Sequence, residues 1–258
     1  MSLDYLEKAN SHERDKDVIL IEQSHKYIVK NRIFTSTTTF IHSLFKPFDS
    51  TAIINNMMNS PNWKDSIYYG KSKQEIKSLW KQNGKEAASA GTLMHEDIEK
   101  FYNNMQVNNN SIEYSYFLDF QKSHKHLVPY RTEWKIYDEE LQLSGCIDIV
   151  YIDKETDELI LGDWKRCKEI KKINTWKKYS INDLISHIPD TNFFHYSLQL
   201  NVYKRILEKN YNKKVKEMFL VCLHPENFNN SYLKYKVKDM TKEVNALFNQ
   251  RKEIINNK

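Results

Sequence analysis

Two short apolar runs, each with an aspartate in it or beside it, mark the centre of the chain. The first run covers residues 147–152 and contains Asp148, and the second covers 159–161 and leads to Asp163. The polar segment between them predicts the turn of a β-hairpin. A hairpin centred on that segment places Asp148 opposite Asp163. Because side chains alternate along a strand, Lys165 shares the face of Asp163. The pattern therefore predicts two carboxylates and one ammonium group in a single small patch.

The rest of the chain mixes strand and helix periodicity. Strands are predicted within 18–33, on both sides of 138–140 within 131–153, at 214–223 and at 232–237. Helices are predicted at 38–45, 51–60, 73–104 with breaks near Gly84 and Gly91, 112–126, 180–187, 193–210 and 240–255. This order predicts an α/β (α+β) fold with a central mixed sheet flanked by helices and a mostly helical N-terminal elaboration. We expect residues 1–86 to pack as strands and helices on a core formed by 87–258, in one compact unit.

Composition limits the classes of protein that the chain can represent. Its 258 residues are enough for one good hydrophobic core, and no apolar run approaches the roughly 20 residues of a membrane span. The start of the sequence is too polar for a signal peptide. Three widely spaced cysteines (Cys146, Cys167 and Cys222) suggest neither a disulfide framework nor a metal knuckle. We therefore expect an intracellular, reducing compartment, cytoplasm or nucleus, rather than secretion. The net charge of +5 is compatible with a polyanionic partner.

Opposed carboxylates in a sheet require compensation. Like charges directly across a strand pair are unfavourable, and apolar neighbours increase the cost. A divalent cation such as Mg²⁺ removes that cost, because it binds a few carboxylates together with water. The pair formed by Asp148 and the Asp163-Trp164-Lys165 segment resembles the signature of the PD-(D/E)XK nuclease superfamily. A salt-bridged surface hairpin would be the alternative interpretation.

A second set of residues is spaced along the predicted helix 73–104. Gly91, His95 and Glu99 follow one another at intervals of four, so they form one stripe on the helix, and the glycine would allow another element to approach closely. RecB-like exonucleases of the superfamily carry a similar helix before their carboxylate strands. The resemblance implies that His95 is a metal ligand and that Glu99 lies near the substrate. Glu99 as a solvated helix charge is the alternative.

The strand that precedes Asp148 carries one further acid. Glu133 alternates with Trp134 and therefore points away from it. RecB-like proteins often have a glutamate on this strand, before a segment like 145–148, so the resemblance implies that Glu133 belongs to the catalytic set. An exposed Glu133 paired with Lys135 or Arg131 remains the other interpretation.

Two polar residues stand on the predicted helix 193–210. Gln199 and Tyr203 are four residues apart and therefore neighbours on one helix face. A Gln-x-x-x-Tyr pair after Asp-x-Lys resembles the last motif of RecB-like nucleases, where it implies contact with the DNA strand. The resemblance covers about residues 87–207, with all four motifs in the family's order.

A basic run lies between the last two motifs. Seven lysine and arginine residues, including Arg166 and Lys168, fall within 165–178, and Trp176 is interleaved with them. Beside a phosphodiester site, the cations would neutralise backbone phosphates, and Trp176 could stack on an unpaired base. A merely solvated surface is the alternative here too.

Together these motifs predict a metal-dependent nuclease. The resemblance implies that His95, Asp148 and Asp163 bind one or two Mg²⁺ or Mn²⁺ ions, and that Lys165 orients water or stabilises the transition state. Three cysteines make an iron–sulfur cluster unexpected, and no Walker A motif is present. The first expectation is a DNA exonuclease that acts on single-stranded DNA or on ends, in replication or repair. An RNA endonuclease of the cap-snatching kind and a non-catalytic nucleic-acid-binding module are the alternatives. Lys165 follows Asp163 in an Asp-x-Lys segment, and this position favours the exonuclease over the RNA endonuclease.

Overall fold

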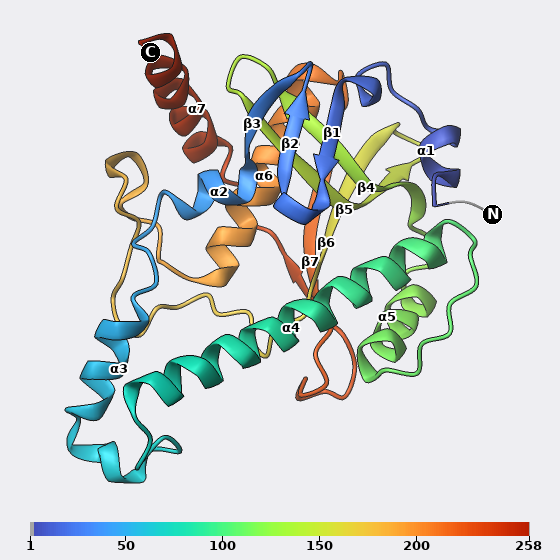
Figure 1. Ribbon diagram of the computed structural model, residues 1–258. Helices are drawn as coiled ribbons and strands as arrows, with labels where there is room; N and C mark the ends of the chain where they lie inside the picture. Colours follow the sequence, from blue (N-terminus) through green and yellow to red (C-terminus); the bar gives the residue numbers. More distant parts are fainter. Residues whose placement is uncertain (1–2, 258) are drawn as a thin grey trace.

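The computed structural model describes residues 3–257 and shows an α/β protein built on one mixed sheet (Figure 1). The sheet has eight strands: β1 (Val18–Ile21), β2 (Lys26–Val29), β3 (Arg32–Ser36), β4 (Val128–Asp138), β5 (Leu143–Asp153), β6 (Glu158–Lys165), β7 (Val215–Cys222) and β8 (Leu233–Lys236). Seven α-helices lie in the described part of the chain: α1 (Tyr5–Ala9), α2 (Thr37–His42), α3 (Ser50–Met58), α4 (Lys73–Tyr102), α5 (Ile112–Ser123), α6 (Asn192–Asn210) and α7 (Thr241–Asn256).

The central hairpin has the predicted register. Strands β5 and β6 pair antiparallel, with Ile149 opposite Gly162 and Asp153 opposite Glu158. This pairing confirms the alignment that places Asp148 and Asp163 next along the hairpin. The two aspartates follow the last paired residues, where the strands stop forming a ladder.

Strand β5 forms a fork in the sheet. Strand β4 pairs along one edge of β5. The opposite edge is shared by β3, which pairs parallel at Leu143 and Ser144, and by β6, which pairs from Ile149 onward. Residues 145–148 therefore lie between two partner strands on that edge. Because no strand pairs with residues 145–148 on this edge, side chains from other elements can approach the backbone of β5 there.

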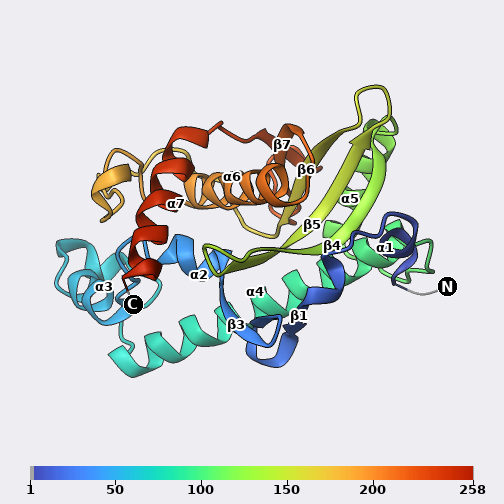
Figure 2. The ribbon, with the colours of Figure 1, turned by 90° about the horizontal axis from the view of Figure 1, so that it is seen from above.

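Helices cover both faces of the sheet, and the strands alternate accordingly. Figure 2 shows α6 and α7 on one side and α4 on the other. On β6, Leu161 belongs to the core shared with α6 and α7, whereas Ile160 belongs to the core shared with α4 and α5. On strand β7, Leu220 likewise belongs to the core shared with α6 and α7, and Phe219 to the core shared with α4 and α5. Burial on both faces explains why these strands are almost continuously apolar.

Helix α4 is continuous, so the predicted breaks near Gly84 and Gly91 are wrong. A glycine inside a helix costs about 1 kcal/mol relative to alanine, which weakens a helix without ending it. A capping box formed by Ser72 and Glu75 holds the start of α4, and Met94 packs its second half against the core. A methyl group on Gly91 would meet nothing within 4 Å, so the expected close approach at that glycine is also wrong.

Two other segments differ from the expected elements. Residues 18–33 begin a meander of three strands rather than one or two, because Lys30 and Asn31 both adopt positive φ and close a tight turn between β2 and β3. In place of a helix at 180–187 there is a single 3₁₀ turn, Asp183–Ile185, which Asn182 caps. No helix of residues 3–257 combines the length and the apolar character needed to cross a lipid bilayer.

Candidate metal centre and active site

Three potential metal ligands from three elements meet at the fork. His95 comes from α4, Glu133 from β4 and Asp148 from β5, and their ligand atoms lie within 4.8 Å of one another. The His95 Nδ1 atom is 3.7 Å from Glu133 Oε1 and 3.6 Å from Asp148 Oδ2. One imidazole nitrogen and two carboxylates thus face a common point.

Backbone groups of β6 orient two members of this group. The His95 Nε2–H donates to the carbonyl oxygen of Trp164 at 3.0 Å, which leaves Nδ1 directed at the carboxylates. The N–H of Trp164 donates to Asp148 Oδ2 at 2.9 Å. A histidine whose second nitrogen is fixed by a carbonyl has the arrangement common among metal ligands.

Charge accumulates in this half-buried site. Burial and the nearby Asp163 charge raise the pKa of Asp148 to about 7. Burial alone would lower the pKa of His95, but Asp148 and Glu133 outweigh burial and raise it to about 9. For Glu133, burial raises the pKa, and the hydrogen bond and charge of His95 overcome it, so the pKa ends below its usual value. In the metal-free protein a protonated His95 therefore takes the place that a cation would fill.

Asp163 on β6, the predicted partner of Asp148, forms an ion pair with a lysine. Asp163 is 2% exposed, and its Oδ2 lies 2.7 Å from the Lys165 ammonium. This contact confirms that the two residues share a face. Asp163 is not among the three grouped ligands, although its charge acts on Asp148. The ammonium also lies 4.7 Å from the ring centre of Tyr196 on α6.

Glu133 has a backbone conformation that is unusual for a strand. Its φ is +43°, in the left-handed region, which costs on the order of 1–3 kcal/mol for a non-glycine residue. Such conformations persist where the surrounding structure holds them in place. The residues on either side of Glu133 provide that restraint.

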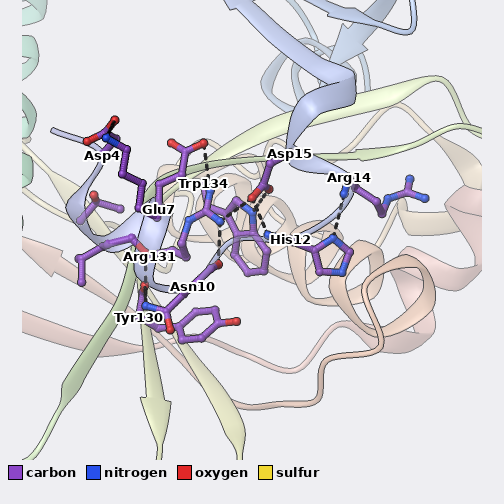
Figure 3. Close-up of polar contacts among 12 residues, drawn as sticks. Asp4, Glu7, Asn10, His12, Arg14, Asp15, Tyr130, Arg131 and Trp134 are labelled. Atoms are coloured by element: carbon purple, nitrogen blue, oxygen red, sulfur yellow. Dashed lines mark hydrogen bonds and ion pairs between the residues drawn. The ribbon is translucent and has the colours of Figure 1, made fainter. Parts of the chain in front are cut away.

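The restraint is a polar clamp on the N-terminal segment (Figure 3). Asp15 Oδ2 accepts a hydrogen bond from Arg131 Nη1 at 2.7 Å, and its Oδ1 accepts one from Trp134 Nε1 at 2.9 Å. Arg131 also donates to the carbonyl oxygen of Asn10 at 3.0 Å. Both β4 side chains are buried, so one carboxylate fixes the strand before and after Glu133.

Glu99 lies one turn after His95 on α4. Its burial and the charge of Glu133 raise its pKa to about 7. Glu99 is half-buried and the charge of Glu133 acts on it, so its predicted place near the substrate remains a prediction. It is not one of the three grouped ligands.

The Gln-x-x-x-Tyr pair packs over the fork. Gln199 Nε2 donates to the Tyr203 hydroxyl at 2.9 Å, as expected for neighbours on one helix face. A Cβ atom on Gly145 would lie 2.4 Å from Cε1 of Tyr203, so the glycine lets this ring touch β5. Gln199 also donates to Thr38 of α2 at 3.4 Å.

Two residues of the basic run have ion-pair partners outside the acidic cluster. Arg166 donates to Glu113 at 2.7 Å, and Lys168 pairs with Glu226 at 2.9 Å. Trp176 is 83% exposed. The structure thus does not bring these three residues into the cluster of acids, and their predicted contact with substrate remains a prediction.

Two residues at the fork were not expected. Cys146 Sγ donates to Glu133 Oε2 at 3.1 Å, and strand alternation from Asp148 could have indicated it. Tyr27 of β2 has a pKa raised by burial and by the nearby Cys146, Glu133 and Asp148. No signal in the sequence connects β2 with this site, because only the sheet brings them together.

The donors present fit a divalent metal ion. Mg²⁺ prefers carboxylate oxygens and water, and an imidazole ligand shifts the preference toward Mn²⁺. His95, Glu133 and Asp148 supply one nitrogen and two carboxylates on one side of a common point. An ion bound there would replace the protonated His95 as the positive charge between the carboxylates.

Comparisons with known proteins add little to this geometry. No protein-family model matches the sequence, and no curated protein matches it. The crystal structure of SSO0001 is one solved structure similar to this chain, with 12% identity over 98% of this chain and 83% of that one, at a TM-score of 0.35. A TM-score of this size does not establish a shared fold, and the likeness says nothing about function.

Proposed function

We propose that this chain is a metal-dependent nuclease with a PD-(D/E)XK core and the RecB-like order of motifs. One observation carries the proposal: a group of His95, Glu133 and Asp148 lies at a fork in the sheet. The pair of Asp163 and Lys165 occupies the next positions on the adjoining strand. A purely structural hairpin has no need of two acids and a histidine gathered at one half-buried point.

Within this proposal, three residues hold one Mg²⁺ or Mn²⁺ ion. They are His95 through Nδ1 and the carboxylates of Glu133 and Asp148. When bound, the ion would lower the pKa of a water molecule and offset negative charge on the phosphate. For a second ion, Asp163 would be the further ligand, because its charge acts on Asp148.

Lys165 supplies the fixed positive charge of the proposed active site. Burial would lower its pKa, but the charges of Asp163 and Asp148 outweigh burial and keep the pKa above its usual value. The ammonium is therefore cationic at neutral pH. Directed at a phosphate, it stabilises the negative charge that develops in the transition state. Asp163 restricts where the ammonium can lie.

DNA is the proposed substrate, either single-stranded or with free ends. Tyr203 packs directly on β5 at Gly145 and holds Gln199 through a hydrogen bond, so in this proposal Gln199 is the member of the pair that would contact the DNA strand. The motif order of the RecB-like family favours exonuclease activity, with a place in replication or repair.

End-labelled DNA tests the proposal. Single-stranded DNA carrying a label at the 5′ or the 3′ end is incubated with wild-type protein in Mg²⁺, Mn²⁺ or EDTA, beside the Lys165→Ala protein. We expect metal-dependent degradation that falls at least a hundredfold in the variant. Full activity in Lys165→Ala would disprove the assignment. Cleavage of RNA alone would favour the endonuclease alternative, and binding without cleavage would favour the non-catalytic module.

A further inference from the structure

A hollow of about 860 Å³ is lined by residues of the segment that joins α2 to α3, of the loop that joins β6 to α6, and of the helices at their ends. The two segments are tied together at one point. Both the backbone N–H of Ile181 and the hydroxyl of Ser180 donate to the carbonyl oxygen of Leu44, at 2.9 and 2.7 Å. The walls of the hollow are therefore held at a fixed separation.

Flat aromatic groups line this hollow. The Phe45 ring centre is 4.0 Å from that of His195, and Phe48 is 73% exposed. The ring of Phe48 also lies 6.1 Å from Trp80 of α4, so aromatic surface continues toward that helix. Phe45 is buried, so Phe48 is the phenyl ring on this lining with an accessible face on which a flat aromatic ligand could stack.

Charges of both signs surround the hollow. Lys46 and Lys178 line it, and within residues 3–257 neither ammonium has an ion-pair partner. The acids on the lining are engaged: Asp190 pairs with His195 at 3.0 Å, and Asp49 caps α3 through the N–H of Ala52. The two ammonium groups are therefore available to phosphates beside the exposed ring of Phe48.

The hollow connects to the proposed active site. A smaller hollow of about 130 Å³ shares His42 and His195 with it and extends to Tyr196 and Gln199. The Tyr196 ring lies 4.7 Å from the Lys165 ammonium. The larger hollow is therefore a neighbour of the site of Lys165, with His42, His195 and Tyr196 between them.

We propose that the larger hollow binds an unpaired nucleobase of the substrate strand, with adjoining phosphates at Lys46 and Lys178. This inference rests on the proposed nuclease function and adds the strandedness of its substrate. A base within a duplex is stacked and paired, so it cannot enter a hollow lined by phenyl rings without leaving its partner. The volume lies in the range of sites that enclose a small organic ligand. The substrate must therefore be single-stranded on this side of the scissile bond.

The test measures binding separately from cleavage. A single-stranded oligonucleotide carries one 2-aminopurine, whose position is moved along the strand, and is bound to Lys165→Ala protein in Mg²⁺. Phe48→Ala in the same background removes one exposed ring, and Phe228→Ala, at a residue 86% exposed in the β7–β8 connection, is the matched control. Melting temperatures check that each variant folds.

We expect 2-aminopurine fluorescence to be quenched at one position only, and Phe48→Ala to weaken binding about tenfold and relieve the quenching. Phe228→Ala should match its parent. Replacing Lys46 and Lys178 with alanine should reduce the slope of log affinity against log salt by about 0.7 for each lysine, whereas Lys125→Ala should not change it.

The outcomes separate the two proposals. If wild-type protein cleaves single strands but Phe48→Ala and the two lysine variants bind as their parent does, the base site is wrong and the nuclease stands. Equal affinity for single strands and for duplexes with closed ends would also overturn the base site. If quenching at Phe48 occurs in a wild-type protein that never cleaves, the base site stands and the nuclease fails.

Discussion

The ring of Tyr203 lies against the backbone of Gly145, three residues before Asp148 on the same strand. A side chain at position 145 would place its Cβ 2.4 Å from Cε1 and 2.9 Å from the hydroxyl of Tyr203. The contact joins helix α6 to the fork of the sheet. It explains why this strand has a glycine just before its aspartate.

Gly145→Ala should therefore lower both stability and activity. The added methyl group must displace the Tyr203 ring or the strand, and overpacking of this kind costs about 1–3 kcal/mol. Chemical denaturation and end-labelled cleavage measure the two effects. Gly84→Ala is the matched control, because a methyl group there meets nothing within 4 Å. The change also replaces a glycine in the interior of a helix. It should add up to about 1 kcal/mol of stability. Equal stability of the two variants would refute the steric argument.

Asp15→Ala should impair the active site from the far side of β4. The change removes the acceptor for Arg131 and Trp134, and leaves a buried guanidinium without its carboxylate. We expect a loss of about 3–5 kcal/mol in unfolding free energy. In the folded fraction, released strain at Glu133 should weaken Mn²⁺ binding, measured by calorimetry. Glu139→Ala removes an exposed pair with Lys30 instead and should change neither quantity much. Unaltered Mn²⁺ affinity in Asp15→Ala would show that the clamp does not position Glu133.

Asp148→Asn should stabilise the metal-free protein and abolish its response to metal. The ionised carboxylate is buried near Asp163, and its pKa of about 7 shows that the charge is unfavourable in the folded state. Asparagine keeps the acceptor for the Trp164 N–H and removes the charge. At pH 8 in EDTA, the variant should be more stable by on the order of 1–3 kcal/mol. Wild-type protein should gain stability from Mn²⁺, and the variant should not. A variant that melts earlier than wild type in EDTA would contradict this reasoning.

Glu99→Gln should show that the ionised Glu99 side chain on α4 lowers the free energy of unfolding in a pH-dependent way. The pKa of Glu99 in the folded protein, about 7, is above the usual glutamate value of 4.5, so its ionisation opposes folding. The wild-type protein therefore loses stability as pH rises from about 4.5 to 7, and the loss is complete above 7. In EDTA at pH 8, Glu99→Gln should be more stable by about 1–2 kcal/mol, after allowance for partial solvent screening. The advantage should disappear near pH 4.5. A constant difference between the two proteins across this range would exclude Glu99 as the source.

The sequence by itself determined the local order of the site. The hairpin register followed from two apolar runs around a polar turn, and alternation placed Lys165 beside Asp163. Helical spacing likewise placed Gln199 beside Tyr203. These relationships depend on backbone periodicity over a few residues, which the order of apolar and polar residues encodes directly.

Only the tertiary structure decided which of these residues meet. The grouping of His95, Glu133 and Asp148 depends on how α4 crosses a fork in the sheet, and no spacing in the sequence contains that geometry. Asp15 and Tyr27 reach the site through contacts more than a hundred residues apart in the chain. Such contacts arise from the packing of whole elements, which depends on the combined burial of many side chains rather than on any local pattern.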